Sequence, residues 1–276
     1  MSDYIPNHLL ANVLLRLPFD SLLQSRRVSK SWRALIDSSD FIKIHLNKAN
    51  QEANSPSGIK IIGLNQNNFY TLVLDLEADS SSITASAKQL NGPSDYSGSE
   101  VCLKGSCNGL LCLMYPDTDK IILWNPWIQK SWELPSFPIE YHTRGSAIFH
   151  LGFGYDRVDD EYKVLNRTSF QIYVIEINRV GGGFGADIWV MEDYEVDKSW
   201  TKLTSVTMPG WTFWSLTPLA LSKNNRQLLL QIDGVKLVLH DLETKRISDL
   251  ATRGDVSFVQ SSCTCIGSLV TPFGTD

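Results

Sequence analysis

Long apolar runs are missing from this 276-residue chain, and no stretch approaches the roughly 20 apolar residues that a membrane-spanning helix requires. The first residues, Met1 to Tyr4, hold no basic segment ahead of an apolar one, so no secretory signal is expected. Both absences predict an intracellular protein, in the cytoplasm, the nucleus or both, with no membrane partner.

Cysteines are few and odd in number. They are Cys102, Cys107, Cys112, Cys263 and Cys265. An odd count in a chain without a secretory signal predicts reduced thiols. A zinc site would need four ligands at paired short spacings, and Cys263-Thr264-Cys265 has no second pair. We therefore expect no metal and no cofactor.

Catalytic motifs are also lacking, since no H-E-x-x-H, P-loop or G-x-S-x-G sequence occurs. Gly181 to Ala186 formally match G-x-G-x-x-A, but dinucleotide binding needs a helix after the glycines, and a strand-like run follows here. This segment is therefore predicted to be an exposed hairpin loop. Cys107 could pair with His142 or His150 as nucleophile and base, but nothing fixes their proximity. No catalytic residue is expected, and the chain is predicted not to be an enzyme.

The charge is modest and uneven. The net charge is -5, with 43% hydrophobic and 20% charged residues, and no basic stripe with interleaved aromatics occurs, so a nucleic-acid partner is not expected. Residues 1–50 hold seven Lys or Arg against four Asp, a balance of +3, which leaves -8 for the remainder. A basic N-terminal region would suit an acidic partner surface.

The N-terminal 40 residues predict three short helices. Apolar residues from Leu9 to Leu17 follow the period of a helix, which Pro6 can begin and Pro18 must end. A second helix is expected over 22–27, capped by Asp20 or Ser21, and a third from near Ser29. So short a helical unit cannot bury all its apolar side chains internally, which favours a partner surface.

This run resembles the F-box. The family's Leu-Pro step corresponds to residues 14–18 (Leu-Leu-Arg-Leu-Pro), and its Val-Ser-Lys-x-Trp step ends at Trp32. The acidic residue that often follows the first proline is absent, because Asn7 and His8 stand there. The resemblance implies docking on a Skp-type adaptor and, through it, a cullin. The adaptor-binding residues expected are Pro6, Leu9, Leu10, Val13, Leu17, Pro18, Leu22, Val28 and Trp32. The alternative is a helical subdomain that simply packs on the rest of the chain.

After this head, spanning residues 1–46, the polar segment 47–60 is predicted to be a linker. Residues 61–276 are predicted to form an all-β, antiparallel body, because short β-prone runs alternate with turn signals, of which Asp233-Gly234 is the strongest. A weak repeat of strand, turn and strand favours propeller-like blades. It predicts that Trp124, Trp189 and Trp200 are buried between four-stranded sheets.

The body also resembles the F-box-associated, kelch-like region of plant F-box proteins. The resemblance rests on segments 105–112, 124–126, 152–156, 162–164 and 189–191 and on the closing segment 268–272. Family members usually carry about two more blades between the Tyr-Lys-Val and Trp-Val-Met strands. About four blades are expected here. Either the ring is small and irregular, or the body is shortened and has an open edge.

Three functions are compatible with this organisation. The first is a non-catalytic substrate receptor of a Skp-cullin-F-box ubiquitin ligase that recruits an unknown protein target for ubiquitination. The second is a protein-interaction module with no degradative output. The third is an enzyme whose propeller binds a sugar or another small molecule, although no catalytic motif supports it.

Overall fold

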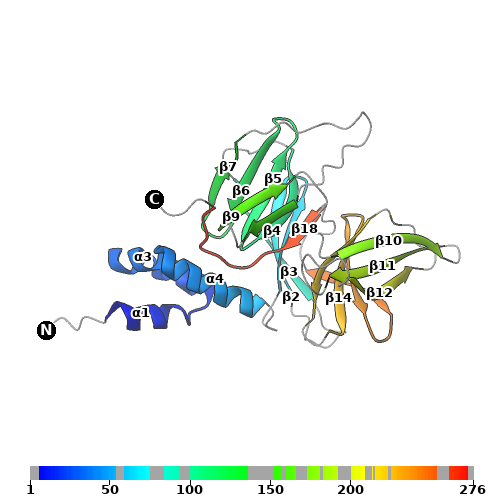
Figure 1. Cartoon of the computed structure of the whole chain (residues 1–276), viewed down its shortest axis with the longest axis horizontal. Helices are drawn as coiled ribbons and strands as arrows, with labels where there is room; N and C mark the ends of the chain where they lie inside the picture. Colours follow the sequence, from blue (N-terminus) through cyan, green and yellow to red (C-terminus); the bar gives the residue numbers. More distant parts are fainter. Residues whose placement is uncertain are drawn as a thin grey trace.

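The computed structural model describes residues 6–53, 59–74, 84–93, 100–135, 152–156, 160–165, 173–180, 183–191, 200–208, 213, 215–222, 225–253 and 261–272. Four helices form the head, and eighteen strands follow in these ranges (Figure 1). The helices are α1 (Asn7–Leu14), α2 (Phe19–Ser25), α3 (Lys30–Ile36) and α4 (Ser39–Ala53). In the described part of the chain, no helix is long and apolar enough to cross a membrane.

The first three helices lie where the sequence predicts them. Pro6 precedes α1, and Pro18 lies immediately before α2. The side chain of Ser29 caps α3, since its Oγ accepts a hydrogen bond from the Trp32 backbone N–H at 3.1 Å. The predicted Asp20 or Ser21 cap is wrong, because α2 already begins at Phe19 and has no side-chain cap. Asp20 instead lies in the first turn of α2, where its negative charge interacts favourably with the positive end of the helix dipole.

The prediction of a linker over 47–60 is wrong at both ends of this segment, where the structure has a helix and a strand. Helix α4 continues through residues 47–53, and β1 starts at Ile59. The sequence from Asn47 to Ala53 is polar but contains no Gly or Pro, and Ala, Lys, Gln and Glu are good helix formers. Polarity there marks the exposed face of a helix rather than a flexible connection.

The body consists of antiparallel sheets. Its strands are β1 (Ile59–Asn65), β2 (Asn68–Leu74), β3 (Thr84–Leu90), β4 (Cys102–Cys107), β5 (Leu110–Tyr115), β6 (Lys120–Asn125), β7 (Lys130–Glu133), β8 (Gly152–Asp156), β9 (Glu161–Leu165), β10 (Tyr173–Val180), β11 (Gly183–Met191), β12 (Trp200–Met208), β13 (Leu216–Leu221), β14 (Gln227–Ile232), β15 (Lys236–Asp241), β16 (Ile247–Asp249), β17 (Ala251–Arg253) and β18 (Ser261–Thr264). The sheets are β17-β3-β2-β1-β18, β4-β5-β6-β7, β8-β9, β10-β11-β12 and β13-β14-β15-β16. Only two of these have the predicted four strands.

The first sheet contains strands from both ends of the body. Strand β1 pairs antiparallel with β18, so the C-terminal strand joins the sheet that the first body strands begin. One pairing departs from the predicted antiparallel arrangement, because β17 runs parallel to β3 over three residue pairs. We call this sheet the closing sheet.

Five sheets pack in a row with the closing sheet in the middle. Ile61 and Ile62 are adjacent on β1, so their side chains point to opposite faces. Ile61 lies in a core with residues of β14 and β15, whereas Ile62 lies in a core with residues of β5 and β6. Further apolar clusters join β4–β7 to β8–β9 and join β13–β16 to β11–β12. Among the described residues, no apolar core joins β8–β9 to β10–β12.

The turn and tryptophan predictions have mixed outcomes. Asp233 and Gly234 have φ angles of 50° and 67° between β14 and β15, which confirms that hairpin. Trp124 is buried between two sheets, with its ring centroid 4.8 Å from that of Phe69. Trp189 is only partly buried, and the side chain of Trp200 lies outside the described residues.

The predicted exposed loop over 181–186 is wrong in part. Val180 pairs directly with Gly183, so the hairpin connection is only two residues long. Gly183 to Ala186 belong to strand β11, and Gly185 and Ala186 are buried. Two of these four residues are glycines, and glycine occurs in strands that another part of the chain approaches closely as well as in turns.

A C-terminal segment, residues 265–272, runs from β18 between the helices and the β4–β7 sheet (Figure 1). We call it the strap. The fully buried Asn125 fixes it, because Nδ2 donates to the backbone oxygens of Ser268 at 2.9 Å and Val270 at 3.0 Å. Its Oδ1 accepts from the backbone N–H of Trp127 at 3.0 Å. The amide side chain thus uses both its donor and its acceptor groups.

Replacing Asn125 by Asp should destabilise the whole protein. The carboxylate would lose both donated hydrogen bonds and place a buried negative charge against two carbonyl oxygens, at a cost of about 3 kcal/mol or more. Chemical denaturation monitored by tryptophan fluorescence measures this change. The matched control is Asn12→Asp on the exposed face of α1, for which a change below about 0.5 kcal/mol is expected. Equal stability of Asn125→Asp and the wild type would contradict the assigned role of Asn125.

Candidate functional site

The helical head has its own core. It is formed by Leu10, Leu14, Leu22, Ile36, Phe41 and Leu269, each at most 7% exposed. Leu269 comes from the strap, so this core is completed by the C-terminal end of the chain. Leu10 and Leu22, both expected from the sequence to contact an adaptor, are 7% and 0% exposed and belong to this core.

The other expected adaptor-binding residues remain at or near the surface. Leu9, Val13 and Val28 are 49%, 58% and 63% exposed. Leu9 and Val13 are four residues apart on α1 and therefore share one face. Pro6 and Pro18 are exposed, whereas Leu17 and Trp32 are partly buried. We call Pro6, Leu9, Val13, Leu17, Pro18, Val28 and Trp32 the apolar face of the head.

One exposed apolar residue was missed from the sequence. Ile44 on α4 is 53% exposed, and it lies in the helix that the sequence pattern did not predict. Phe41 and His45 are buried and lie about 40° apart on the helix circumference, whereas Ile44 lies about 60° from Phe41 and about 100° from His45, off this buried face. An apolar residue that is out of phase with its helix's buried face is a candidate contact residue.

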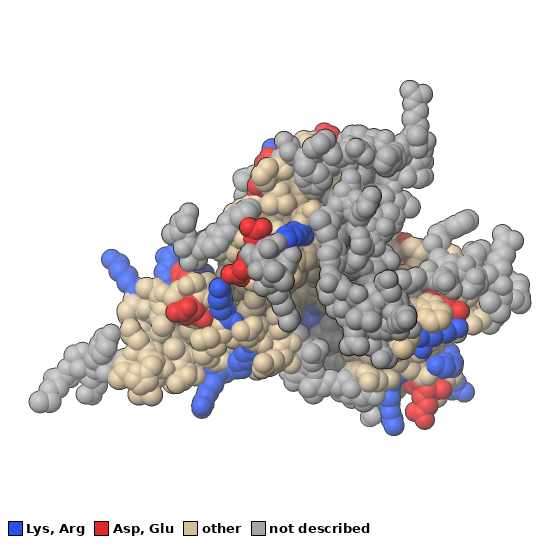
Figure 2. Space-filling view, in the orientation of Figure 1, with Lys and Arg blue, Asp and Glu red and all other residues tan. Residues whose placement is uncertain are grey.

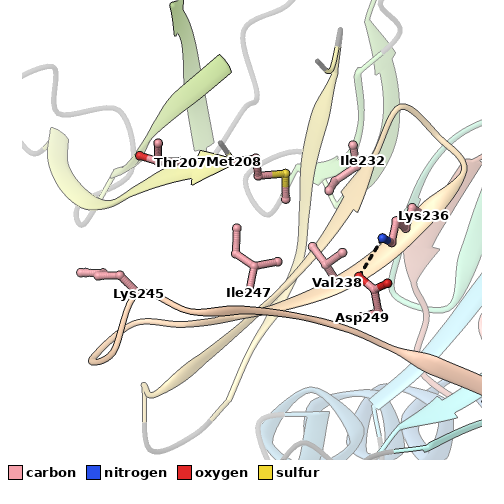
Figure 3. A pocket seen from close by; sticks show the side chains of 8 residues that line it. All are labelled: Thr207, Met208, Ile232, Lys236, Val238, Lys245, Ile247 and Asp249. Carbon is pink, nitrogen blue, oxygen red and sulfur yellow. Dashed lines mark ion pairs between the residues drawn. The ribbon is translucent and has the colours of Figure 1, made fainter. Parts of the chain in front are cut away.

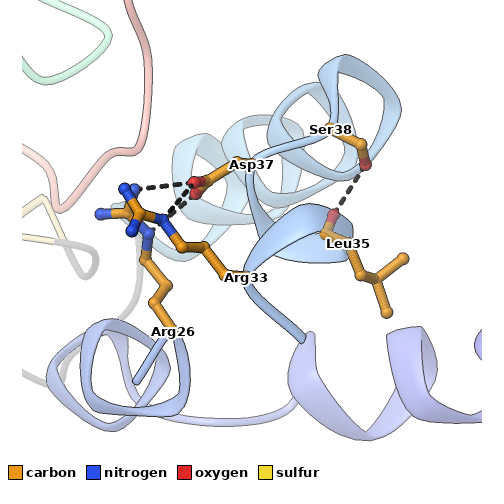
Figure 4. Close-up of polar contacts among 5 residues, drawn as sticks. All are labelled: Arg26, Arg33, Leu35, Asp37 and Ser38. Atoms are coloured by element: carbon orange, nitrogen blue, oxygen red, sulfur yellow. Dashed lines mark hydrogen bonds and ion pairs between the residues drawn. The ribbon is translucent and has the colours of Figure 1, made fainter. Parts of the chain in front are cut away.

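Ion pairs to Asp37 connect the C-terminal ends of α2 and α3 (Figure 4). Arg26, at the end of α2, engages Asp37 at the end of α3 with two contacts, Nε to Oδ1 at 2.8 Å and Nη2 to Oδ2 at 2.9 Å. Arg33 reaches the same carboxylate from one turn earlier, with Nε 3.5 Å from Oδ2. The Arg26 side chain is 24% exposed and that of Arg33 is 68% exposed. The bidentate contact of Arg26 is therefore the stronger of the two.

These two arginines make a matched pair for mutation. Arg26→Ala should lower the free energy of unfolding by about 1–2 kcal/mol, because it removes a partly buried bidentate contact between two helix ends. Arg33→Ala should cost less than about 0.5 kcal/mol, because its longer contact is exposed to solvent. Thermal and urea denaturation of both variants compares the effects. An equal loss in the two variants would contradict the assigned role of Arg26.

The body presents a small cleft between β12 and the β14–β16 strands (Figure 3). Its volume is about 280 Å³, and its apolar lining comes from Met208, Ile232, Val238 and Ile247. Lys236 and Asp249 form an ion pair of 2.7 Å across one side. In the described residues, no group of three or more His, Cys, Asp and Glu side chains is placed to hold a metal. The cleft offers shape and one ion pair but no reactive group.

Four thiols of the body, those of Cys107, Cys112, Cys263 and Cys265, are poor nucleophiles. Burial raises the pKa of Cys107 to about 11, and it raises the pKa of Cys112 and Cys263 to about 12. Burial also raises the pKa of Cys265. Because the thiolate is the reactive form, these cysteines are almost entirely protonated and unreactive near neutral pH. His142 and His150, considered as base partners of Cys107, lie outside the described residues.

Comparisons with known proteins identify both parts of the chain. Residues 3–44 match the F-box domain, and residues 60–180 match the F-box associated beta propeller domain. The chain is thus an F-box protein with an F-box-associated β body. The helical head described above corresponds to the first match, although α4 extends beyond its end.

The relatives are plant proteins. The F-box protein CPR1 of Arabidopsis thaliana is 24% identical over 360 aligned positions, which include 89% of this chain and 84% of CPR1. An F-box/kelch-repeat protein of the same plant, At3g23880, is 31% identical over 58% of this chain and 44% of its own length. A third, F-box protein At3g07870, is 26% identical over 83% of this chain and 52% of its own length. The chain therefore spans about half the length of the last two relatives.

The chain is short for this family. The alignment with CPR1 has more positions than this chain has residues, so it includes segments of CPR1 with no counterpart here. Among solved structures, a chain from Bacteroides uniformis described as a 6-phosphogluconolactonase is similar over 74% of this chain and 56% of its own, at 11% identity and a TM-score of 0.20. This last likeness is too weak to support any argument.

Proposed function

We propose that this protein is a substrate-recognition subunit of a Skp-cullin-F-box ubiquitin ligase. The observation that carries the proposal is the apolar face of the head, which matches the F-box domain. Leu9, Val13 and Val28 of this face are exposed and do not belong to the core of the head. Apolar surface of this kind, rimmed by polar residues, is typical of a protein interface. The body would hold a protein target, and the cullin assembly would supply catalysis by proximity.

Charge supports the proposed orientation of the adaptor. Figure 2 shows Lys and Arg side chains projecting from the helical head. Arg16, Arg27 and Lys30 are exposed on or between α1, α2 and α3, close in sequence to the apolar face. An adaptor with an acidic surface would be steered toward this face, and the apolar residues would then provide the binding energy.

Adaptor binding should depend on Leu9 and Val13. The double variant Leu9→Ala/Val13→Ala should weaken binding to a Skp-type adaptor at least about tenfold, because truncated interface anchors cost about 1–3 kcal/mol each. Isothermal titration calorimetry with the purified adaptor measures the affinity. The stability of this variant should remain close to that of the wild type, because both side chains are about half exposed.

The matched control for this experiment is Val73→Ala/Val235→Ala, which truncates two body residues that are 43% and 42% exposed. It should leave adaptor affinity unchanged. Truncation of Leu10 or Leu22 is not a clean test, since both are core residues and their loss would unfold the head. If the folded Leu9→Ala/Val13→Ala variant binds the adaptor as tightly as the wild type does, the proposed interface is wrong.

Target degradation should require the same apolar face. We expect a protein that co-purifies with the body under proteasome inhibition to have a longer half-life when this chain is replaced by Leu9→Ala/Val13→Ala. The variant should still capture the target, because the substitutions lie outside the body. Pulse-chase measurement of the captured protein's half-life provides the test. Unchanged half-lives would instead support an interaction module without degradative output.

A further inference from the structure

A second hollow lies at the junction of the head and the body. Its volume is about 760 Å³, and it is bordered by the α1–α2 connection, α4, β1, β13, the β4–β5 turn and the strap. This volume falls in the range of small-molecule sites, which occur preferentially where two domains meet. We call it the junction groove.

The junction groove is positively charged. Arg16, Lys48 and Lys60 line it, whereas no Asp or Glu is among the described residues that do so. Two of these cations have fixed positions. Lys48 Nζ donates to the backbone oxygen of Leu15 at 2.6 Å, and Lys60 Nζ lies 4.9 Å from the ring centroid of Trp127. Three cations around one hollow without a carboxylate in its lining create a local excess of positive potential.

The remaining lining mixes apolar and neutral polar side chains. Leu17 and Phe19 contribute from the head, Leu219 and Leu221 from β13, and Ile266 from the strap. The amide side chains of Asn50 and Asn108 meet across the groove from α4 and the β4–β5 turn, with Nδ2 3.3 Å from Oδ1. The groove therefore combines apolar walls with cations and a few neutral hydrogen-bonding groups, which is the composition expected of a ligand site.

We propose that the junction groove binds a small amphipathic organic anion, with a carboxylate, phosphate or sulfonate near Lys60 and Arg16 and an apolar body against Leu219 and Phe19. The cations favour the negative group, and the leucine and phenylalanine side chains favour a ring or a short aliphatic chain. A ligand in this position would touch the head, the body and the strap together. It would therefore stabilise their mutual arrangement.

The test uses the full chain and two fluorescent probes with the same ring skeleton. 8-Anilino-1-naphthalenesulfonate carries a sulfonate, and N-phenyl-1-naphthylamine is its neutral counterpart. We expect saturable binding of the anionic probe at one site per chain and at least about tenfold weaker binding of the neutral one. Lys60→Gln should weaken binding of the anionic probe about three- to tenfold, and adding Arg16→Gln should weaken it further.

The matched control is Lys130→Gln, which removes the same charge from an exposed position of β7 outside the groove. It should bind the anionic probe as the wild type does. Lys60 belongs neither to the apolar face nor to the basic residues proposed to steer the adaptor, so the adaptor affinity of the Lys60→Gln variant reports separately on the proposed function. Equal affinity for the two probes, binding that Lys60→Gln leaves unchanged, or the absence of saturable binding would each overturn the proposal.

Discussion

The arrangement of this protein depends on how one buried amide holds the strap. Asn125 lies at the end of β6 and satisfies both the strap's carbonyl groups and the backbone of the following turn. A second constraint acts from the neighbouring hairpin, because Gly109 (φ 81°) lies so close to the strap that a Cβ there would be 2.3 Å from the Ser268 Cβ. In this position of the strap, the side chain of Leu269 packs in the core of the head. The helices and the β body are thus joined through the last described residues of the chain.

This attachment makes the head and the body neighbours with several independent contacts. The Phe19 ring, at the start of α2, lies 6.0 Å from the Trp127 ring and packs directly on Gly267. Lys43 on α4 forms an ion pair with Asp160, whose pKa is lowered by hydrogen bonds from Tyr155 and from Lys43 itself. A substrate receptor of the proposed kind would benefit from such fixation, because productive transfer depends on positioning.

Sequence reasoning succeeded where the signal was local. The start of α3 near Ser29 and the Asp233-Gly234 hairpin each depend on a few adjacent residues. The prediction failed where two apolar residues differ only in the side of the helix on which they lie. Leu9 and Leu10 are about 100° apart on one helix, so periodicity marks both as apolar but does not decide which one the strap's Leu269 will cover. The parallel β17–β3 pair was missed because long-range packing, rather than local propensity, determines it. The end of α4 was missed because its polar sequence was interpreted as a linker, although its residues are good helix formers.

The closing sheet is central to the β body. Strand β18 pairs with β1, so the two ends of the body are joined within the closing sheet. The row of sheets then extends from that sheet in both directions, to β8–β9 on one side and to β10–β12 on the other. These two outer sheets are consecutive in sequence. The closing sheet continues into the strap, and the strap completes the core of the head that carries the apolar face.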